Sequence, residues 1–397
     1  MVKYEDIKQK DAFHLTHGSH GFIKALLWLL YFIAILIAAL HAFRKPEYNW
    51  DMLPYMALTI KIEHQDVDLI HKETYRIAKE NMPSAAYEML VDSSIPYRKK
   101  MYENPSEFYK QLPFYSVKPF YIGLVYLANK SGIPLPSATV FPSALSFVLI
   151  GILLLYCLQL YLQLYNAIIF SFLIMITAPM LHVAGISTPD GISALIMMSA
   201  MYFVVVKPRL WPLVALLLLS IFTRLDNVIA CFAIVSLLAL SRKSVLTINR
   251  KQYLIILLLL LLGYITVAMS ASAYGWSLFY YTHFFRYLNL SHEYHAGFSL
   301  KEYLQVLYSH VIAGLYYSNM VVCLLLIGLI SLRKQGMKIN DLSFDQQFAC
   351  CILGVIAVRT ILYPDISDRF YAPFYLIIYI LFIRRYAGLV ALSANKD

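Results

Sequence analysis

The chain has 397 residues, of which 60% are hydrophobic and only 14% are charged, and its mean hydropathy is +0.63. Soluble domains carry charge on nearer a quarter of their residues, so this composition predicts a polytopic membrane protein and leaves no room for a second globular domain. The formal net charge is +10, but the basic residues gather in short segments between apolar runs. That placement is typical of orientation signals and of contact with anionic membrane lipids, and it argues against nucleic acid as a partner.

Ten apolar runs have the length of a membrane span, about 20 residues, or come close to it. The first run, 22–42, is too long for the core of a signal peptide and is expected to remain as an anchor. The runs 210–223 and 225–240 are shorter than the others. The full set in chain order is 22–42, 138–160, 165–185, 190–206, 210–223, 225–240, 253–271, 309–331, 347–363 and 370–384.

The segment 43–137 is the only large polar connection between these runs. From Val67 to Ile77, apolar residues recur at helical spacing opposite a basic face, which is typical of a helix that lies on a membrane surface. The stretch from Pro119 to Leu127 has a similar character and is too short to cross a bilayer. We therefore expect interfacial amphipathic helices within this segment.

The distribution of basic residues predicts the orientation. With the N-terminus in the cytoplasm, ten spans place most basic residues of the short connections on the cytoplasmic side, as the positive-inside rule requires. The sequence thus predicts an all-α polytopic membrane protein with about ten transmembrane helices, both termini in the cytoplasm and 43–137 as a long external loop. It predicts a single membrane domain over 1–397 without a soluble C-terminal domain, most simply in a bacterial inner membrane.

This topology brings the charged residues that interrupt apolar surroundings to the external side. Charge at membrane depth costs roughly 2.5–3.5 kcal/mol per residue on insertion scales, so it usually marks a site or a pair. The residues are Asp51, Asp190, Arg224, Asp226, Asp365, Asp368 and Arg369, and the connection 272–308 adds aromatic and histidine residues that include His283. The chemistry is therefore expected at the external face.

Asp51 and Lys118 each have a structural and a functional interpretation. Asp51 follows Trp50 just after the first run, where it could cap a helix or act as a general base toward an acceptor hydroxyl. Lys118 precedes Pro119, where it could be a snorkelling lysine on an interfacial helix or the partner of a lipid phosphate.

The later charged residues have the same two interpretations. Asp190 opens a run, where it could cap a buried helix or orient a cation or a substrate hydroxyl. Arg224 and Asp226 separate two short runs, and solvation of a tight hairpin is the simpler interpretation of both. Arg369 opens the last run, where orientation rules do not account for it and an anionic partner is expected.

Several other chemistries find no support in the sequence. His14, His17 and His20 fall in a short N-terminal segment without acidic or cysteine partners, so surface placement is a simpler interpretation than a metal site. The five cysteines lack metal-ligand spacing and are interpreted as small hydrophobic residues. There is no glycine-rich phosphate loop and no nucleophile elbow, which argues against a nucleotide-driven pump.

The order of these motifs resembles that of the membrane-embedded GT-C glycosyltransferases, which include the lipid A aminoarabinose transferases and the protein O-mannosyltransferases. In that superfamily the first span leads into a long external loop that opens with an acidic motif, here Trp50-Asp51. The loop closes with a Lys-Pro motif on a surface helix, here Lys118-Pro119. Asp51 is followed by Met52 rather than by a second acid, which leaves the role of a divalent cation open.

Two later motifs extend the resemblance. In the superfamily a further aspartate opens a later span, as Asp190 does here, and an Arg-Tyr-x-x-Pro-like element opens a late span, as Arg369 to Pro373 does here. The resemblance implies transfer of a sugar from a polyprenyl-phosphate carrier to a glycan, lipid or protein acceptor at the external face. The implied site has Asp51 as general base, Lys118 and Arg369 at the donor phosphate, Asp190, Asp226, Arg224 and Asp368 as positioning residues, and Tyr55, Tyr121 and His283 as loop contacts.

One candidate base and a phosphate leaving group predict inversion at the anomeric carbon. The alternative function is a membrane transporter or flippase of lipid-linked or small anionic substrates. Such a protein is expected to have paired repeats, broken central helices and charges at the bilayer midplane, whereas the charges here lie at the ends of apolar runs. A glycan polymerase or ligase and a purely structural subunit also stay open at this point.

Overall fold

The computed structural model describes residues 17–273, 299–316, 318–331, 342–365 and 367–393. Regular secondary structure in this part is helical apart from one isolated bridge between Glu47 and Ile186, which confirms the all-α prediction. The principal helices are α1 (His17–Arg44), α2 (Met52–Lys61), α3 (Val67–Asn81), α4 (Ser84–Leu90), α5 (Pro96–Glu103), α6 (Pro105–Lys110), α7 (Pro113–Ser116), α8 (Pro119–Lys130), α9 (Leu135–Gln159), α10 (Leu164–Met175), α11 (Ala178–Gly185), α12 (Asp190–Val205), α13 (Leu210–Thr223), α14 (Val228–Leu240), α15 (Arg250–Ser270), α17 (Leu300–Leu315), α18 (Ser318–Ser331), α19 (Phe344–Leu362) and α20 (Asp368–Ser393), with a short 3-10 turn η2 (Leu225–Asn227) between α13 and α14.

Long apolar helices indicate a membrane protein. In the described part of the chain, five helices are long and apolar enough to cross a membrane, or up to seven if each bent pair forms one span. The five are α1, α9, α15, α19 and α20, and the bent pairs are α10 with α11 and α17 with α18. The sequence predicts ten spans, whereas α12, α13 and α14 are shorter apolar helices of 16, 14 and 13 residues.

The apolar run 165–185 is broken in the middle. Its two halves, α10 and α11, are bent by 63° relative to each other. The break comes just before Pro179, which occupies the first turn of α11, because proline has no amide hydrogen to continue the preceding helix and fits best at a helix start.

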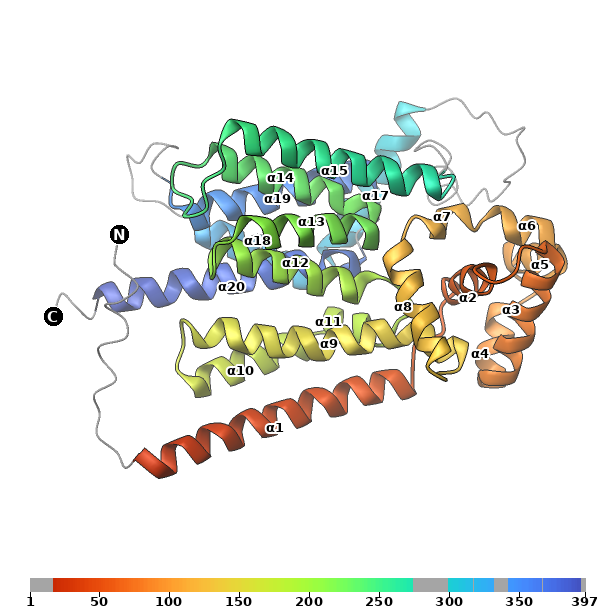
Figure 1. The fold of residues 1–397 in the computed structure, drawn as a ribbon, viewed down its shortest axis with the longest axis horizontal. Helices are drawn as coiled ribbons and strands as arrows, with labels where there is room; N and C mark the ends of the chain where they lie inside the picture. Colours follow the sequence, from red (N-terminus) through yellow and green to blue (C-terminus); the bar gives the residue numbers. More distant parts are fainter. Residues whose placement is uncertain (1–16, 274–298, 317, 332–341, 366, 394–397) are drawn as a thin grey trace.

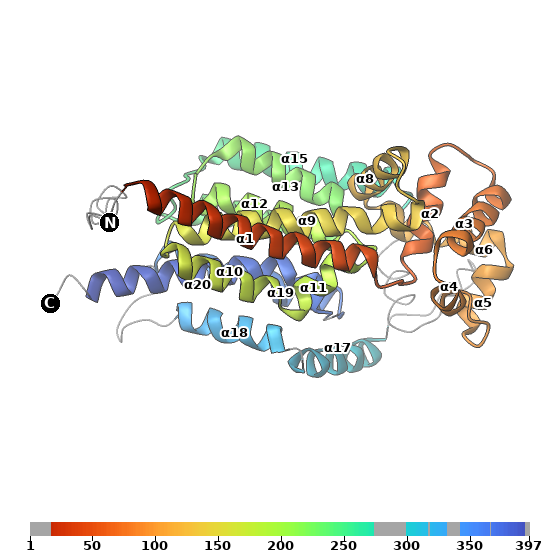
Figure 2. The same cartoon turned by 90° about the horizontal axis from the view of Figure 1, so that it is seen from below.

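Two apolar clusters divide the molecule. One joins α1 with α9 to α15 and with α18 to α20. The other joins α2 to α6 and α8 to the first turns of α9. Figures 1 and 2 show α2 to α8 gathered at one end of the bundle, where α8 lies beside the end of α9 and α2 to α6 lie farther out.

The connections at this end hold most of the predicted site residues. α1 ends and α2 begins here, α12, α14 and α20 begin here, and α13 and α19 end here. The opposite end of the bundle holds the connections 206–209 and 241–249. The fold therefore separates a basic end from an end with mixed charge.

Candidate active site

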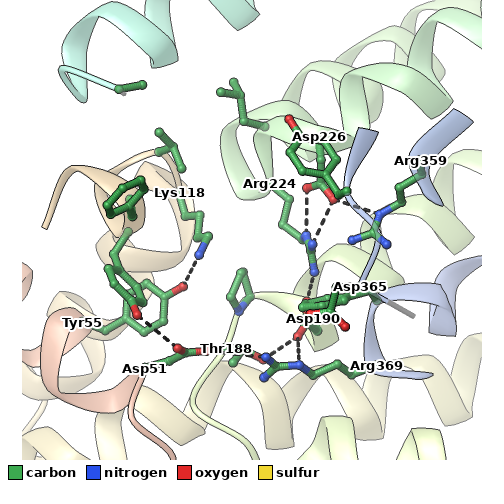
Figure 3. Close-up of a pocket in the computed structure, with 18 of the residues that line it drawn as sticks. Asp51, Tyr55, Lys118, Thr188, Asp190, Arg224, Asp226, Arg359, Asp365 and Arg369 are labelled. Carbon is green, nitrogen blue, oxygen red and sulfur yellow. Dashed lines mark hydrogen bonds and ion pairs between the residues drawn. The ribbon is translucent and has the colours of Figure 1, made fainter. Parts of the chain in front are cut away.

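A cavity of about 610 Å³ lies where the two apolar clusters meet. Its walls come from α2, the segment from α7 to α8, the start of α12, the turn between α13 and α14, and parts of α15, α17, α19 and α20. Figure 3 shows how the charged side chains face one another across it. Those that line it are Asp51, Lys118, Asp190, Arg224, Asp226, Arg359, Asp365 and Arg369.

Asp51 stands at the N-cap position of α2, yet its side chain caps no backbone amide. Its Oδ1 atom accepts a long hydrogen bond from the Tyr115 hydroxyl, 3.3 Å away. Its Oδ2 atom lies 3.7 Å from a terminal nitrogen of Arg369, and the side chain remains 26% exposed. The capping interpretation is therefore wrong, and the carboxylate lines the cavity.

Lys118 immediately precedes Pro119, the first residue of α8, and its side chain lines the cavity. Its Nζ atom donates to the Tyr55 hydroxyl at 2.6 Å and lies 5.2 Å from the ring centroids of both Tyr55 and Tyr115, within cation–π range. Within the described chain no carboxylate lies at ion-pair distance from it. Burial lowers the pKa of the Lys118 ammonium to about 8, because it removes the charged form from water.

Arg224 and Asp226 form the centre of a buried ion-pair network. Arg224 donates two hydrogen bonds to the Asp226 carboxylate, at 3.0 and 2.9 Å. Arg224 also binds Asp190, and the Arg359 Nε atom donates to Asp226 at 3.1 Å. The side chains of Arg224 and Asp226 are only 11% and 17% exposed, so the interpretation that they solvate a hairpin is wrong.

Both carboxylate oxygens of Asp190 have protein partners. Its Oδ2 atom accepts from the Thr188 hydroxyl at 2.8 Å, while its Oδ1 atom binds Arg224. It is buried, and a buried carboxylate is tolerated when it is paired and hydrogen-bonded. Asp190 is the first residue of α12, and the network thus ties this helix to the turn after α13.

Arg369 lies between Asp51 and Asp190. Its Nε atom is 3.7 Å from Asp190 Oδ2, and its NH2 atom is 3.7 Å from Asp51 Oδ2. Both separations exceed hydrogen-bond range. The centroid of the Phe370 ring lies 4.7 to 4.9 Å from the guanidinium carbons of Arg224, Arg359 and Arg369, so three cations surround one aromatic ring.

Two predicted site residues, Asp368 and Tyr121, do not line the cavity. Asp368 accepts from the Tyr375 hydroxyl at 2.7 Å and from the Asn319 amide at 3.5 Å, and it does not line the cavity. Tyr121 is fully buried behind Tyr55 and donates to the Thr139 carbonyl at 2.6 Å. Tyr55 itself lines the cavity. The predicted loop contact His283 lies outside the described residues, as do His292, His295 and His14.

Arg359 is the principal residue that sequence reasoning missed. It lies near the end of α19 and is 5% exposed. Its signal was present in the sequence, because it is a charged residue inside the apolar run 347–363. Thr188 and Tyr115 gave no such signal, since hydroxyl partners of a carboxylate become visible only when the fold brings them together.

The charged groups fit anion binding better than a metal held by the protein. Asp190 and Asp226 are occupied by arginines, and the described part of the chain has no group of three or more histidine, cysteine or acidic side chains that could hold a metal ion. Lys118 and Arg369 keep N–H donors directed at the cavity. One carboxylate, that of Asp51, and these two cations therefore line the same cavity.

Comparison of the chain with protein-family models, with curated proteins and with solved structures found no match in any of the three.

Proposed function

We propose that this protein is an integral-membrane glycosyltransferase of the GT-C type, which moves a sugar from a polyprenyl-phosphate carrier to an acceptor hydroxyl. The cavity supports this proposal most directly. It brings the Asp51 carboxylate within 3.7 Å of Arg369 and puts Lys118, which has no carboxylate partner in the described chain, on the facing wall.

Each of these groups has a defined role in the proposed reaction. Asp51 takes the proton of the acceptor hydroxyl as its oxygen attacks the anomeric carbon, a contribution of roughly 10²–10⁴ in rate. The bond from that carbon to the phosphate oxygen breaks, and negative charge builds up on the departing polyprenyl phosphate. Lys118 and Arg369 stabilise this charge because their positions are fixed before the reaction begins. Attack opposite the leaving group inverts the anomeric centre.

The membrane placement forms part of the proposal. α12 and α13 run alongside the long helices in both views, and α14 does so in Figure 1. The 16 residues of α12 extend about 24 Å. We propose that all three helices cross too, which gives about ten spans with both termini in the cytoplasm and α2 to α8 outside. The basic connections at the opposite end of the bundle support this orientation.

Native mass spectrometry of the detergent-purified protein tests donor binding. The protein is titrated with a polyprenyl phosphate, a polyprenyl-phosphate sugar and ordinary phospholipids. We expect both polyprenyl ligands to bind in preference to phospholipids and to lose affinity in Lys118→Ala and Arg369→Ala. Lys99→Ala is the matched control, because it removes a 52% exposed cation of α5 that does not line the cavity. No preference over phospholipids would contradict the proposal.

A transporter or flippase is the second candidate, and the break between α10 and α11 favours it, because transporters use discontinuous helices at their substrate sites. Proteoliposomes distinguish the two functions. A flippase moves a labelled polyprenyl-phosphate sugar between leaflets and leaves it intact, whereas a glycosyltransferase separates the sugar from the phosphate.

A further inference from the structure

Arg369 differs from the other arginines of the cavity in how little it is bound. Arg224 and Arg359 donate hydrogen bonds to Asp226 at 2.9 to 3.1 Å. The two ion pairs of Arg369 are 3.7 Å long, and within the described chain its guanidinium donates no hydrogen bond to protein. Its side chain is 18% exposed and lines the cavity. Its donors are therefore open to an anion that enters the cavity.

The two carboxylates beside Arg369 differ in how strongly other groups bind them. Asp190 is buried, and its two oxygens are engaged by Arg224 and by the Thr188 hydroxyl. Asp51 is 26% exposed, and its one hydrogen bond from the described chain, from Tyr115, is 3.3 Å long. An anion that competes for Arg369 thus displaces Asp51 more easily than Asp190.

We propose that Arg369 couples donor binding to activation of the acceptor: its guanidinium pairs with Asp51 at 3.7 Å and passes to the phosphate of the donor when the donor binds. This inference rests on the proposed function. While Arg369 faces Asp51, the cation stabilises the carboxylate and makes it a poorer base. When a phosphate pairs with the Arg369 guanidinium, which stays beside Asp190, the pair between Arg369 and Asp51 is lost. The Asp51 carboxylate can then accept a proton. The donor therefore binds before the acceptor is activated.

Removal of the negative charge of Asp51 is then expected to strengthen ligand binding instead of weakening it. Asp51→Asn deletes the competitor for Arg369, so an anionic ligand binds more tightly, although the residue lies in the proposed catalytic centre. A partly exposed ion pair is worth up to about 1 kcal/mol, which corresponds to roughly fivefold in affinity. If Asp51 instead helped to bind the donor, the same substitution would weaken binding.

Titration with farnesyl phosphate tests this coupling, with farnesol as the ligand that lacks the phosphate. The matched control is Asp365→Asn, which removes an equal charge from the same cavity. Asp365 accepts from the Ser367 amide at 3.0 Å and makes no ion pair with Arg369. We expect Asp51→Asn to bind farnesyl phosphate about fivefold more tightly than wild type, and Asp365→Asn to change the affinity less. In Arg369→Gln the effect of Asp51→Asn disappears.

Three results contradict the coupling. Unchanged or weaker binding in Asp51→Asn, with binding still lost in Lys118→Gln, overturns the coupling and leaves the proposed function standing. Equal tightening in Asp51→Asn and Asp365→Asn shows a general charge effect and also overturns it. Failure of the wild type to distinguish farnesyl phosphate from farnesol contradicts the coupling and the proposed function together. Asp51→Ala, which removes the same charge, provides a second variant with the same expected tightening if Asp51→Asn does not fold.

Discussion

Lys118 determines how the cavity responds to pH. Its ammonium contacts the Tyr55 hydroxyl and two aromatic rings, none of which offsets the cost of burial as a carboxylate would. The resulting pKa of about 8 lies near physiological pH rather than near 10.4, where an exposed lysine titrates. The charge that Lys118 offers to the proposed phosphate ligand is thus present below about pH 8 and is lost above it.

Binding of farnesyl phosphate is therefore expected to weaken as the pH rises through about 8. The ligand is already a dianion above about pH 7, so the change reports the protein. Lys118→Arg keeps its charge, because arginine titrates above about 12, and its binding should stay level between about pH 7 and 9.5. Affinities from native mass spectrometry at several pH values test this. A wild-type affinity that is level over the same range would contradict the role of Lys118.

Arg359 holds the buried network together from the side of α19. Arg359→Met leaves Asp226 with one cation where it had two, and loss of one partner of a buried ion pair costs about 3–5 kcal/mol. We expect a clear fall in the midpoint of thermal unfolding. Lys99→Met, on the exposed surface of α5, should change stability by less than about 0.5 kcal/mol. Equal midpoints for Arg359→Met and wild type would show that the network contributes nothing to stability.

At the residue level the sequence indicated the charged groups and not their partners. The cost of charge in apolar surroundings marks Asp51, Asp190 and Arg369 without any structure. The same criterion marks Asp368, which bonds to Tyr375 away from the cavity. It also applies to Arg359, which lies inside the apolar run 347–363. Whether a charge faces a cavity or a neighbouring helix depends on packing, which apolar periodicity does not specify.

The start of α12 is positioned by close contact with α9. A Cβ atom on Gly191 would lie 3.2 Å from Ser143 Cα and 3.4 Å from its carbonyl oxygen. The absence of a side chain lets the backbones of the two helices approach. Because Asp190 is the adjacent residue, this contact also determines where its carboxylate meets Arg224 and Arg369.

Gly191→Ala should therefore lower stability and weaken binding of polyprenyl phosphate. Helix propensity alone favours alanine by roughly 0.5–1 kcal/mol, but the overpacking costs typically 1–3 kcal/mol. Gly123→Ala in α8 is the control, since nothing lies within 4 Å of a Cβ atom there, and it should be neutral or stabilising. The midpoints of thermal unfolding of both variants show whether helix propensity or overpacking has the larger effect on stability. A higher unfolding midpoint for Gly191→Ala would contradict this expectation, because it would mean that α9 shifts to accept the Cβ atom at little cost.

At the level of elements, sequence patterns predicted where helices form better than where they bend. All ten apolar runs lie on helices, and the amphipathic stretch from Val67 corresponds to α3. The break between α10 and α11 was not predicted, although Pro179 marks its position. The helices α4 to α7 are too short for periodicity to identify, and they become helical through packing in the second apolar cluster.

The whole molecule has a basic end and a catalytic end in the proposed arrangement. Labelling of single cysteines with an impermeant maleimide, in a variant without the five native cysteines, tests this orientation. In intact cells, Lys99→Cys on α5 should react from outside. Lys243→Cys, between α14 and α15 at the opposite end, should react only after permeabilisation. The reverse pattern, or equal labelling of both positions, would contradict the proposed topology.

The most direct measurement is the fate of a polyprenyl-phosphate sugar incubated with the purified protein in liposomes that contain a membrane extract as the source of acceptor. We predict release of free polyprenyl phosphate and a new glycoside of inverted configuration. Asp51→Asn should reduce the release by roughly 10²–10⁴, while Asp365→Asn retains most of it. Release that Asp51→Asn leaves intact, or a donor that only changes leaflet and keeps its sugar, would contradict the proposed glycosyl transfer.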